Sequence, residues 1–100
     1  MVVVYPVIFT ETETNTLIEV PDLKLYTEAN EEGEARAPLS EAIAMARDII
    51  GLTFAESSSR PQDPSCISRI VVADGVFATE GFSFVSLVDV DLTNYGIKDN

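Results

Sequence analysis

The sequence is 100 residues long, enough for one small domain with a modest core. Hydrophobic residues make up 46% of it, as in globular proteins, and no run approaches the roughly 18 apolar residues that cross a bilayer. Seventeen acidic against six basic side chains give a net charge of −11, which repels phosphate backbones and argues against direct nucleic-acid binding.

The N-terminus and the cysteine content indicate where the protein acts. Residues 1–4 show no basic region followed by an apolar stretch, so no signal peptide is predicted. The single cysteine, Cys66, cannot form an internal disulfide, which agrees with a reducing compartment. Without a histidine to activate it, Cys66 is better explained as a small, half-buried residue than as a reactive thiol. We expect a cytoplasmic protein that contacts no membrane.

The first third of the chain predicts three successive strands. Residues 2–10 are rich in β-branched and aromatic side chains, which favours a strand. Four of its side chains share one face: Val3, Tyr5, Val7 and Phe9. Pro6 cannot donate a ladder hydrogen bond, so this strand has an unpaired stretch or lies at an edge. A polar hairpin loop at 11–16 leads into strands at 16–20 and 23–27, which suggests a meander.

The middle of the chain predicts a loop, a helix and a second loop. Residues 28–37 carry four acids and little to bury, which indicates an acidic loop. Pro38 suits the first position of a helix, where its missing N–H is harmless. Apolar residues then recur at helical spacing: Leu39, Ala42, Ile43, Ala46, Ile49, Ile50 and Phe54. This pattern predicts an amphipathic helix with one face on a sheet, followed by a loop at 55–66.

The last third predicts one further strand. We expect residues 67–72 to be extended and 73–81 to form a turn. Residues 82–92 alternate most clearly, with one face formed by Phe84, Ser86, Val88, Val90 and Leu92. Residues 93–100 are expected to be a frayed tail, or the start of a linker to a DNA-binding module absent from this sequence. The sum is a single α+β domain over 1–100: an antiparallel three-stranded meander, one helix packed on the sheet and a final strand.

Catalytic chemistry is restricted by what the chain lacks. Without histidine, a glycine-rich phosphate loop or a cysteine pair, triad catalysis and most transition-metal sites are excluded. The remaining possibility is a carboxylate cluster that holds Mg²⁺, as in two-metal nucleases. Asp89 and Asp91 share a strand face, and Glu11 or Glu19 is the candidate to approach them. Alternate acids on a strand are more often a solvated face, so we predict no catalytic residue, metal ligand or cofactor.

The distribution of charge favours a binding surface. Residues 1–41 contain nine acids against only Lys24 and Arg36. An acidic surface of this kind attracts cationic partners and speeds their encounter. The alternative explanation is that the acids serve solubility alone. Their concentration in one part of the chain favours a functional surface.

Several segments together resemble a known family. The segments are Tyr5-Pro-Val-Ile-Phe-Thr-Glu11, Val20-Pro-Asp-Leu23, Ser40 to Ile50 in the helix, Pro61-Gln-Asp-Pro-Ser65, and Phe84 to Leu92 followed by Tyr95. Their order over almost the whole chain is similar to that of the HicB family of antitoxins, from bacterial type II toxin–antitoxin systems. Two features depart from the family pattern: an acidic extension replaces the Pro-Gly turn after Leu23, and residues 73–81 are longer than the usual link.

The resemblance implies a fold and a partner. HicB-like domains have a partial RNase H-like βββαβ fold without a working active site, so no enzyme activity is expected. They bind and block HicA, a small basic toxin that cleaves mRNA, and they commonly form dimers or tetramers. Many family members carry a C-terminal DNA-binding module through which the complex represses its own operon.

We therefore predict that the partner-binding residues are acids of the first hairpin and of the following loop. They are Glu11, Glu13, Glu19, Asp22, Glu28, Glu31, Glu32 and Glu34. Two other functions stay open at this point: a metal-dependent RNase H-like nuclease, and a stand-alone regulatory or structural domain without a toxin. A short basic protein encoded in the adjacent reading frame would favour the antitoxin.

Overall fold

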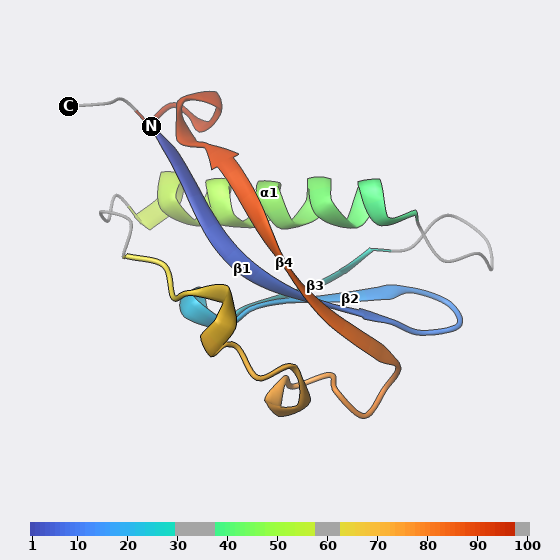
Figure 1. The fold of residues 1–100 in the computed structure, drawn as a ribbon. Coiled ribbons are helices and arrows are strands. Elements are labelled where there is room, and N and C mark those ends of the chain that lie inside the picture. Colours follow the sequence, from blue (N-terminus) through green and yellow to red (C-terminus); the bar gives the residue numbers. More distant parts are fainter. Residues whose placement is uncertain (30–37, 58–62, 98–100) are drawn as a thin grey trace.

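A four-stranded antiparallel sheet with an α-helix across one face makes up the computed structural model (Figure 1). The structure describes residues 1–29, 38–57 and 63–97. Its elements are β1 (Val2–Glu11), β2 (Thr16–Val20), η1 (Pro21–Leu23), β3 (Leu25–Ala29), α1 (Leu39–Ser57), η2 (Ile67–Arg69), η3 (Val72–Asp74), β4 (Phe82–Asp91) and η4 (Leu92–Tyr95), where η denotes a 3-10 helix. The strand order is β3-β2-β1-β4. The predicted α+β class is confirmed.

The pairing of β1 explains how a sheet accommodates Pro6. The backbone N–H of Leu92 donates to the Met1 carbonyl at 2.8 Å, so odd-numbered residues of β1 direct their backbone groups toward β4. Pro6 therefore lacks its N–H on the β2 side. There the pairing with β2 begins only at Ile8, opposite Glu19. The predicted unpaired stretch is confirmed, whereas β1 is an interior strand and not an edge.

The core lies between α1 and one face of the sheet. The buried residues of α1 are Ala42, Ala46, Ile50, Gly51 and Phe54, all of them predicted except Gly51. Ile43 and Ile49 are partly buried, whereas the predicted Leu39 is 43% exposed. The buried residues meet the inward face predicted for β1, where the Tyr5 and Phe54 rings stack with 6.1 Å between centroids. Each large apolar side chain buried in this way stabilises the fold by about 1.5–3 kcal/mol. Hydrophobic burial thus holds the helix at a fixed place on the sheet.

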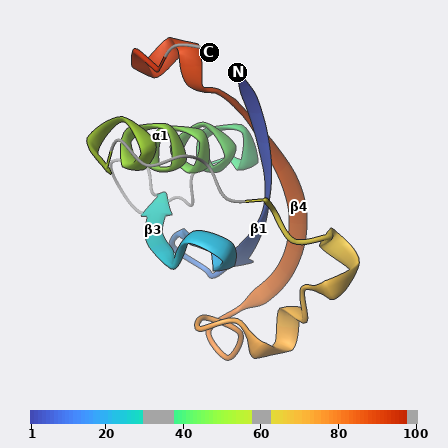
Figure 2. The ribbon, with the colours of Figure 1, turned by 90° about the vertical axis from the view of Figure 1, so that its left-hand side faces the viewer.

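Residues 63–81 cover part of the opposite face. Figure 2 shows α1 on one side of the sheet and residues 63–81 on the other. The prediction that 67–72 is extended is wrong for 67–69, where the backbone N–H of Ile70 donates to the Ile67 carbonyl at 3.1 Å and closes η2, and for Val72, which begins η3. Ile70 and Val71, between the two 3-10 helices, are extended as predicted. Among the described residues this segment pairs with no strand, and its backbone groups close 3-10 turns instead. Within this segment, Cys66 is exposed and not half-buried as predicted.

The start and end of β3 differ from the prediction by two residues. The predicted strand at 23–27 lies instead at Leu25–Ala29, because the chain first forms η1. Lys24, which ends η1, adopts a left-handed conformation with φ 53°. Of the acidic loop predicted at 28–37, Glu28 and Ala29 belong to β3, and residues 30–37 lie outside the described residues.

Two further corrections concern the ends of α1 and β4. The loop predicted at 55–66 is wrong for 55–57, because α1 continues to Ser57, and residues 58–62 lie outside the described residues. The described part of the predicted frayed tail forms η4, where the Asp91 side chain caps the backbone N–H of Thr93 at 3.0 Å. This cap satisfies a backbone N–H at the start of η4 and so favours an ordered turn, where the polar sequence had predicted fraying. Within the described ranges, no helix is long and apolar enough to cross a bilayer.

Candidate partner-binding surface

The turn between β1 and β2 brings three predicted acids to one end of the sheet. Thr12 closes this turn: its backbone N–H donates to the Asn15 carbonyl at 2.9 Å, and its hydroxyl oxygen accepts from the Asn15 N–H at 3.0 Å. The side-chain amide of Asn15 donates to Glu28 Oε2 at 2.8 Å, which links the turn to β3. Glu11, Glu13 and Glu28 lie here, and we call this region the hairpin end.

The described basic side chains lie away from the hairpin end. Lys24 lies at the opposite end of β2 and β3, and Arg69 belongs to η2. Arg47, on α1, donates to Asp89 Oδ1 at 2.9 Å and to the Asp89 carbonyl at 3.0 Å. Its hydrogen bond holds the pKa of the Asp89 carboxyl below the usual value. The charged side chains that the structure describes at the hairpin end are all acidic, so this region suits a cationic partner.

Glu19 and Asp22 use their carboxylates inside the molecule. Glu19 is only 7% exposed, and its Oε1 accepts a hydrogen bond from the Val76 backbone N–H at 3.0 Å. Asp22 accepts two hydrogen bonds from Ser65, from its N–H and its hydroxyl, both at 2.7 Å. These bonds anchor the segment 63–81 on the sheet, while partner binding by the two acids stays a prediction. The remaining predicted acids lie outside the described residues: Glu31, Glu32 and Glu34.

A groove of about 360 Å³ runs between β3 and α1. We call it the β3 groove, and its lining residues are Thr27, Met45, Asp48, Ile49, Leu52, Thr53 and Glu56. Leu52 is 52% exposed and Met45 38%, although both are large and apolar. The two acids beside them, Asp48 and Glu56, give the groove a negative charge. Exposed apolar side chains flanked by acids fit a partner segment that is both apolar and basic.

One acid of the β3 groove is held in place from outside it. The Tyr95 hydroxyl, in η4, donates a hydrogen bond to Asp48. The Tyr95 ring packs on Gly51 of α1, where a Cβ would overlap the ring. The absence of a side chain at Gly51 therefore lets η4 approach α1, and η4 in turn orients a carboxylate that lines the groove.

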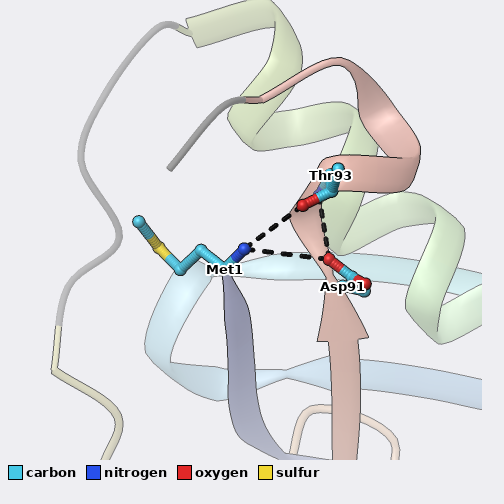
Figure 3. Close-up of polar contacts among 3 residues, drawn as sticks. All are labelled: Met1, Asp91 and Thr93. Carbon is cyan, nitrogen blue, oxygen red and sulfur yellow. Dashed lines mark hydrogen bonds and ion pairs between the residues drawn. The ribbon is translucent and has the colours of Figure 1, made fainter. Parts of the chain in front are cut away.

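Asp91 contacts both the N-terminus of the chain and η4 at one end of the sheet. Its Oδ1 accepts from the Thr93 N–H at 3.0 Å and lies 3.8 Å from the N-terminal ammonium of Met1 (Figure 3). The same ammonium donates to Thr93 Oγ1 at 3.2 Å. The backbone hydrogen bond from Thr93 lowers the pKa of Asp91 below its usual value. These contacts join the first residue of the chain to the residues that follow β4.

The carboxylates needed by a metal-dependent nuclease are separated along β1 and β4. Asp89 pairs with Val4, and Glu11 pairs with Phe82 near the other end of the same ladder. Val4 and Glu11 are seven residues apart on one strand, which corresponds to about 23 Å. In the parts of the chain that the structure describes, no three His, Cys, Asp or Glu residues lie close enough to hold a metal ion.

Comparison with known proteins finds one relevant solved structure. A chain of the "Toxin-Antitoxin complex from Streptococcus pneumoniae" superposes with a TM-score of 0.70 and 29% sequence identity. The match covers 95% of this chain and 73% of that chain. No protein-family model matches the sequence, and no curated protein matches it significantly. The sheet and the helix described above therefore occur together in a chain of a toxin–antitoxin complex.

The β3 groove was not predicted from the sequence. A signal was present, because Met45, Leu52 and Glu56 follow the i, i+7, i+11 spacing of a second stripe on the helix. Met45 and Leu52 are apolar but lie outside the stripe that forms the core. Apolar residues gathered on the outer face of a helix are one feature of binding surfaces.

Proposed function

We propose that this protein is the antitoxin of a type II toxin–antitoxin system and that it neutralises a HicA-like, mRNA-cleaving toxin by direct binding. The observation that carries the proposal is the likeness to a chain of a toxin–antitoxin complex over 95% of the sequence. The ordered HicB-like segments support the same family, and with it a partial RNase H-like domain that acts by binding. The protein acts in the cytoplasm, where its toxin meets mRNA.

Charge supports the role of antitoxin over that of toxin. A ribonuclease toxin must present positive charge to the phosphates of RNA. This chain carries −11 and no histidine, so it is poorly suited to that task. An acidic protein instead occupies the basic surface of the toxin, which raises both association rate and affinity.

The proposed toxin-binding surface has two parts, the hairpin end and the β3 groove. At the hairpin end, Glu13 and Glu28 are exposed. Between β3 and α1 lies the β3 groove, with its exposed Leu52 and the carboxylate of Glu56. The acids attract the toxin at a distance, and the apolar groove supplies the short-range contact that slows dissociation.

The test uses the short basic protein that the adjacent reading frame is expected to encode. Expression of that protein alone in a bacterial host should arrest growth, and co-expression of this chain should restore growth. The two proteins should co-purify, and their association rate should fall as salt rises. If this chain alone arrested growth, the assignment of antitoxin would be wrong.

Two further measurements separate the alternatives. Cleavage of an RNA–DNA hybrid by the pure chain with Mg²⁺ or Mn²⁺ would favour the nuclease. An adjacent frame without a basic protein would favour a stand-alone domain. Repression of the operon is part of the proposal only where a DNA-binding module follows the domain.

A further inference from the structure

β3 lies at an edge of the sheet and has backbone groups that no described strand uses. It pairs with β2 on one side, and the order β3-β2-β1-β4 places no described strand on its other side. The N–H of Thr12 donates to the Asn15 carbonyl, and this bond sets the phase of the ladders. Odd-numbered residues of β2 therefore direct their backbone groups at β1, and even-numbered ones direct them at β3. By the register of β2 with β3, the backbone N–H and C=O groups of Tyr26 and Glu28 point outward.

The side chains of β3 alternate between the two faces of the sheet. Thr27, midway along the strand, lies on the face that carries α1 and lines the β3 groove. Tyr26 lies on the other face, where its ring meets the Phe77 ring edge-on with 6.3 Å between centroids. A strand added beside β3 would alternate in the same way. Every second side chain of that strand would enter the β3 groove, and the others would lie beside Tyr26 and Glu28.

The β3 groove has the length of a short strand. Its lining residues on α1 run from Met45 to Glu56, which corresponds to about 17 Å along the helix. β3 has five residues, which also span about 17 Å. An extended segment that pairs with β3 can therefore contact the helix side of the groove along its whole length.

The charge around β3 favours one kind of occupant. Asp48 and Glu56 line the groove, and Glu28 is exposed on the strand itself. The large apolar side chains beside them, Met45 and Leu52, are exposed. A second copy of this chain would bring a further net charge of −11, and acids on an edge strand oppose the pairing of like-charged copies. A segment with Lys or Arg next to apolar residues instead meets opposite charges and apolar contacts.

We propose that the basic toxin adds one extended segment to the outer edge of β3, with alternate side chains in the β3 groove. The segment pairs with the outward backbone groups of Tyr26 and Glu28 and extends the four-stranded sheet by one strand. Backbone hydrogen bonds of this kind supply affinity, and the groove selects side chains. The segment carries Lys or Arg for Asp48 or Glu56 and an apolar side chain for Leu52. This inference rests on the proposed function and adds the conformation and composition of the segment that binds.

The other edge of the sheet suits such a segment less well. The Asp89 carbonyl of β4 already accepts a hydrogen bond from Arg47 at 3.0 Å. Residues 82–88 contain no acid, so they offer basic side chains no carboxylate. Outward backbone groups, exposed apolar side chains and carboxylates therefore occur together at β3.

Amide hydrogen exchange tests the pairing residue by residue. In the complex with the basic protein of the adjacent reading frame, exchange at Tyr26 and Glu28 should slow by about 10-fold or more relative to the free chain. The amides of Leu25 and Thr27 point at β2 and serve as internal controls, because the ladder protects them in both states. On the toxin, the segment that becomes protected should be extended and should carry Lys or Arg.

Paired substitutions separate the backbone from the side chain. Glu28→Pro and Glu28→Ala both remove the carboxylate, but only Glu28→Pro also removes the outward N–H. Glu28→Pro should therefore raise the dissociation constant of the complex by about 10-fold or more above that of Glu28→Ala. Leu87→Pro is the matched control on β4, and it should leave the dissociation constant unchanged. There the bond from Leu92 to Met1 sets the phase, so the N–H of Leu87 points outward.

Two outcomes would overturn the inference although the complex forms. One is exchange at Tyr26 and Glu28 that is the same in the complex and in the free chain. That result is expected if the toxin lays a helix in the β3 groove, which uses no backbone group of β3. The other is an equal effect of Glu28→Pro and Glu28→Ala, with circular dichroism verifying that both variants are folded. Two proteins that do not associate at all would instead contradict the proposed function, and this inference with it.

Discussion

The Tyr95 hydroxyl donates a hydrogen bond to Asp48 Oδ1 at 2.7 Å, which ties the residues after β4 to the side of α1 that lines the β3 groove. Burial of the phenol, and next the Asp48 carboxylate that accepts its proton, raise the pKa of Tyr95 to about 12 from 10.0. The hydroxyl therefore remains a donor well above neutral pH, and Asp48 keeps its orientation.

This raised pKa predicts a loss of stability in alkali. Because the pKa of Tyr95 is higher in the folded state, its contribution is fully present below about pH 10 and is lost as pH rises through about 12. Tyr95→Phe should lower the free energy of unfolding by about 1 kcal/mol at neutral pH. Urea unfolding at about pH 8 and 11 should show a smaller loss for Tyr95→Phe than for the parent protein. Tyr26→Phe, on an exposed ring, is the control, and an equal pH response in all three proteins would contradict the prediction.

Gly51→Ala tests the contact between α1 and η4. Alanine favours the helix by up to about 1 kcal/mol relative to glycine, but its Cβ would overlap the Tyr95 ring. We expect a net loss of about 1–3 kcal/mol in the parent protein, because the ring must move. In a Tyr95→Ala background the same change should stabilise. A double-mutant cycle measures the coupling, and strictly additive effects would show that the ring and Gly51 are independent.

Glu19→Ala tests how the segment 63–81 is held on the sheet. It removes the acceptor of the Val76 N–H at a nearly buried position and should cost about 1–3 kcal/mol. Glu19→Gln retains an oxygen acceptor and should cost less than about 1 kcal/mol. Amide exchange should reveal faster opening around Val76 in Glu19→Ala, with β1 and β4 less affected. Unchanged exchange at Val76 would mean that this bond does not anchor the segment.

Charge reversal tests the proposed toxin-binding surface. Glu28→Lys together with Glu56→Lys should slow association with the basic toxin by about 10-fold at low salt, and the difference should shrink at about 0.5 M salt. The matched control is Asp74→Lys, which is compared with each single reversal. Asp74 belongs to η3, on the side of the sheet away from α1 (Figure 2). Stopped-flow mixing measures the rates, and equal rates for Glu56→Lys and Asp74→Lys would exclude the β3 groove as an encounter site.

Truncation tests the apolar part of the same surface. Leu52→Ala should leave the association rate nearly unchanged and accelerate dissociation by about 10-fold, because apolar contacts form after encounter. The side chain is 52% exposed in the isolated domain, so the free energy of unfolding should change little. A dissociation rate equal to that of the parent protein would place the contact elsewhere.

Local sequence patterns were sufficient for much of the fold. The inward face of β1 and the buried stripe of α1 follow from periods of two and 3.6 residues, which depend on near neighbours alone. They failed for residues 67–69 and for Val72, which form 3-10 turns although β-branched side chains favoured an extended segment. The outcome there depended on whether the segment pairs with a strand, and that is a property of the assembled molecule.

In the candidate site, too, some properties follow from the sequence and others only from the tertiary structure. The sequence by itself determined the acidity of the chain, the absence of histidine and the alternation that makes strands, because these are properties of composition and near neighbours. Only the tertiary structure decided that Glu19 and Asp22 serve inside the molecule, while Asp48 and Glu56 line a groove. The physical reason is that the role of a carboxylate depends on which distant hydrogen-bond donors the fold brings to it, here Val76 and Ser65.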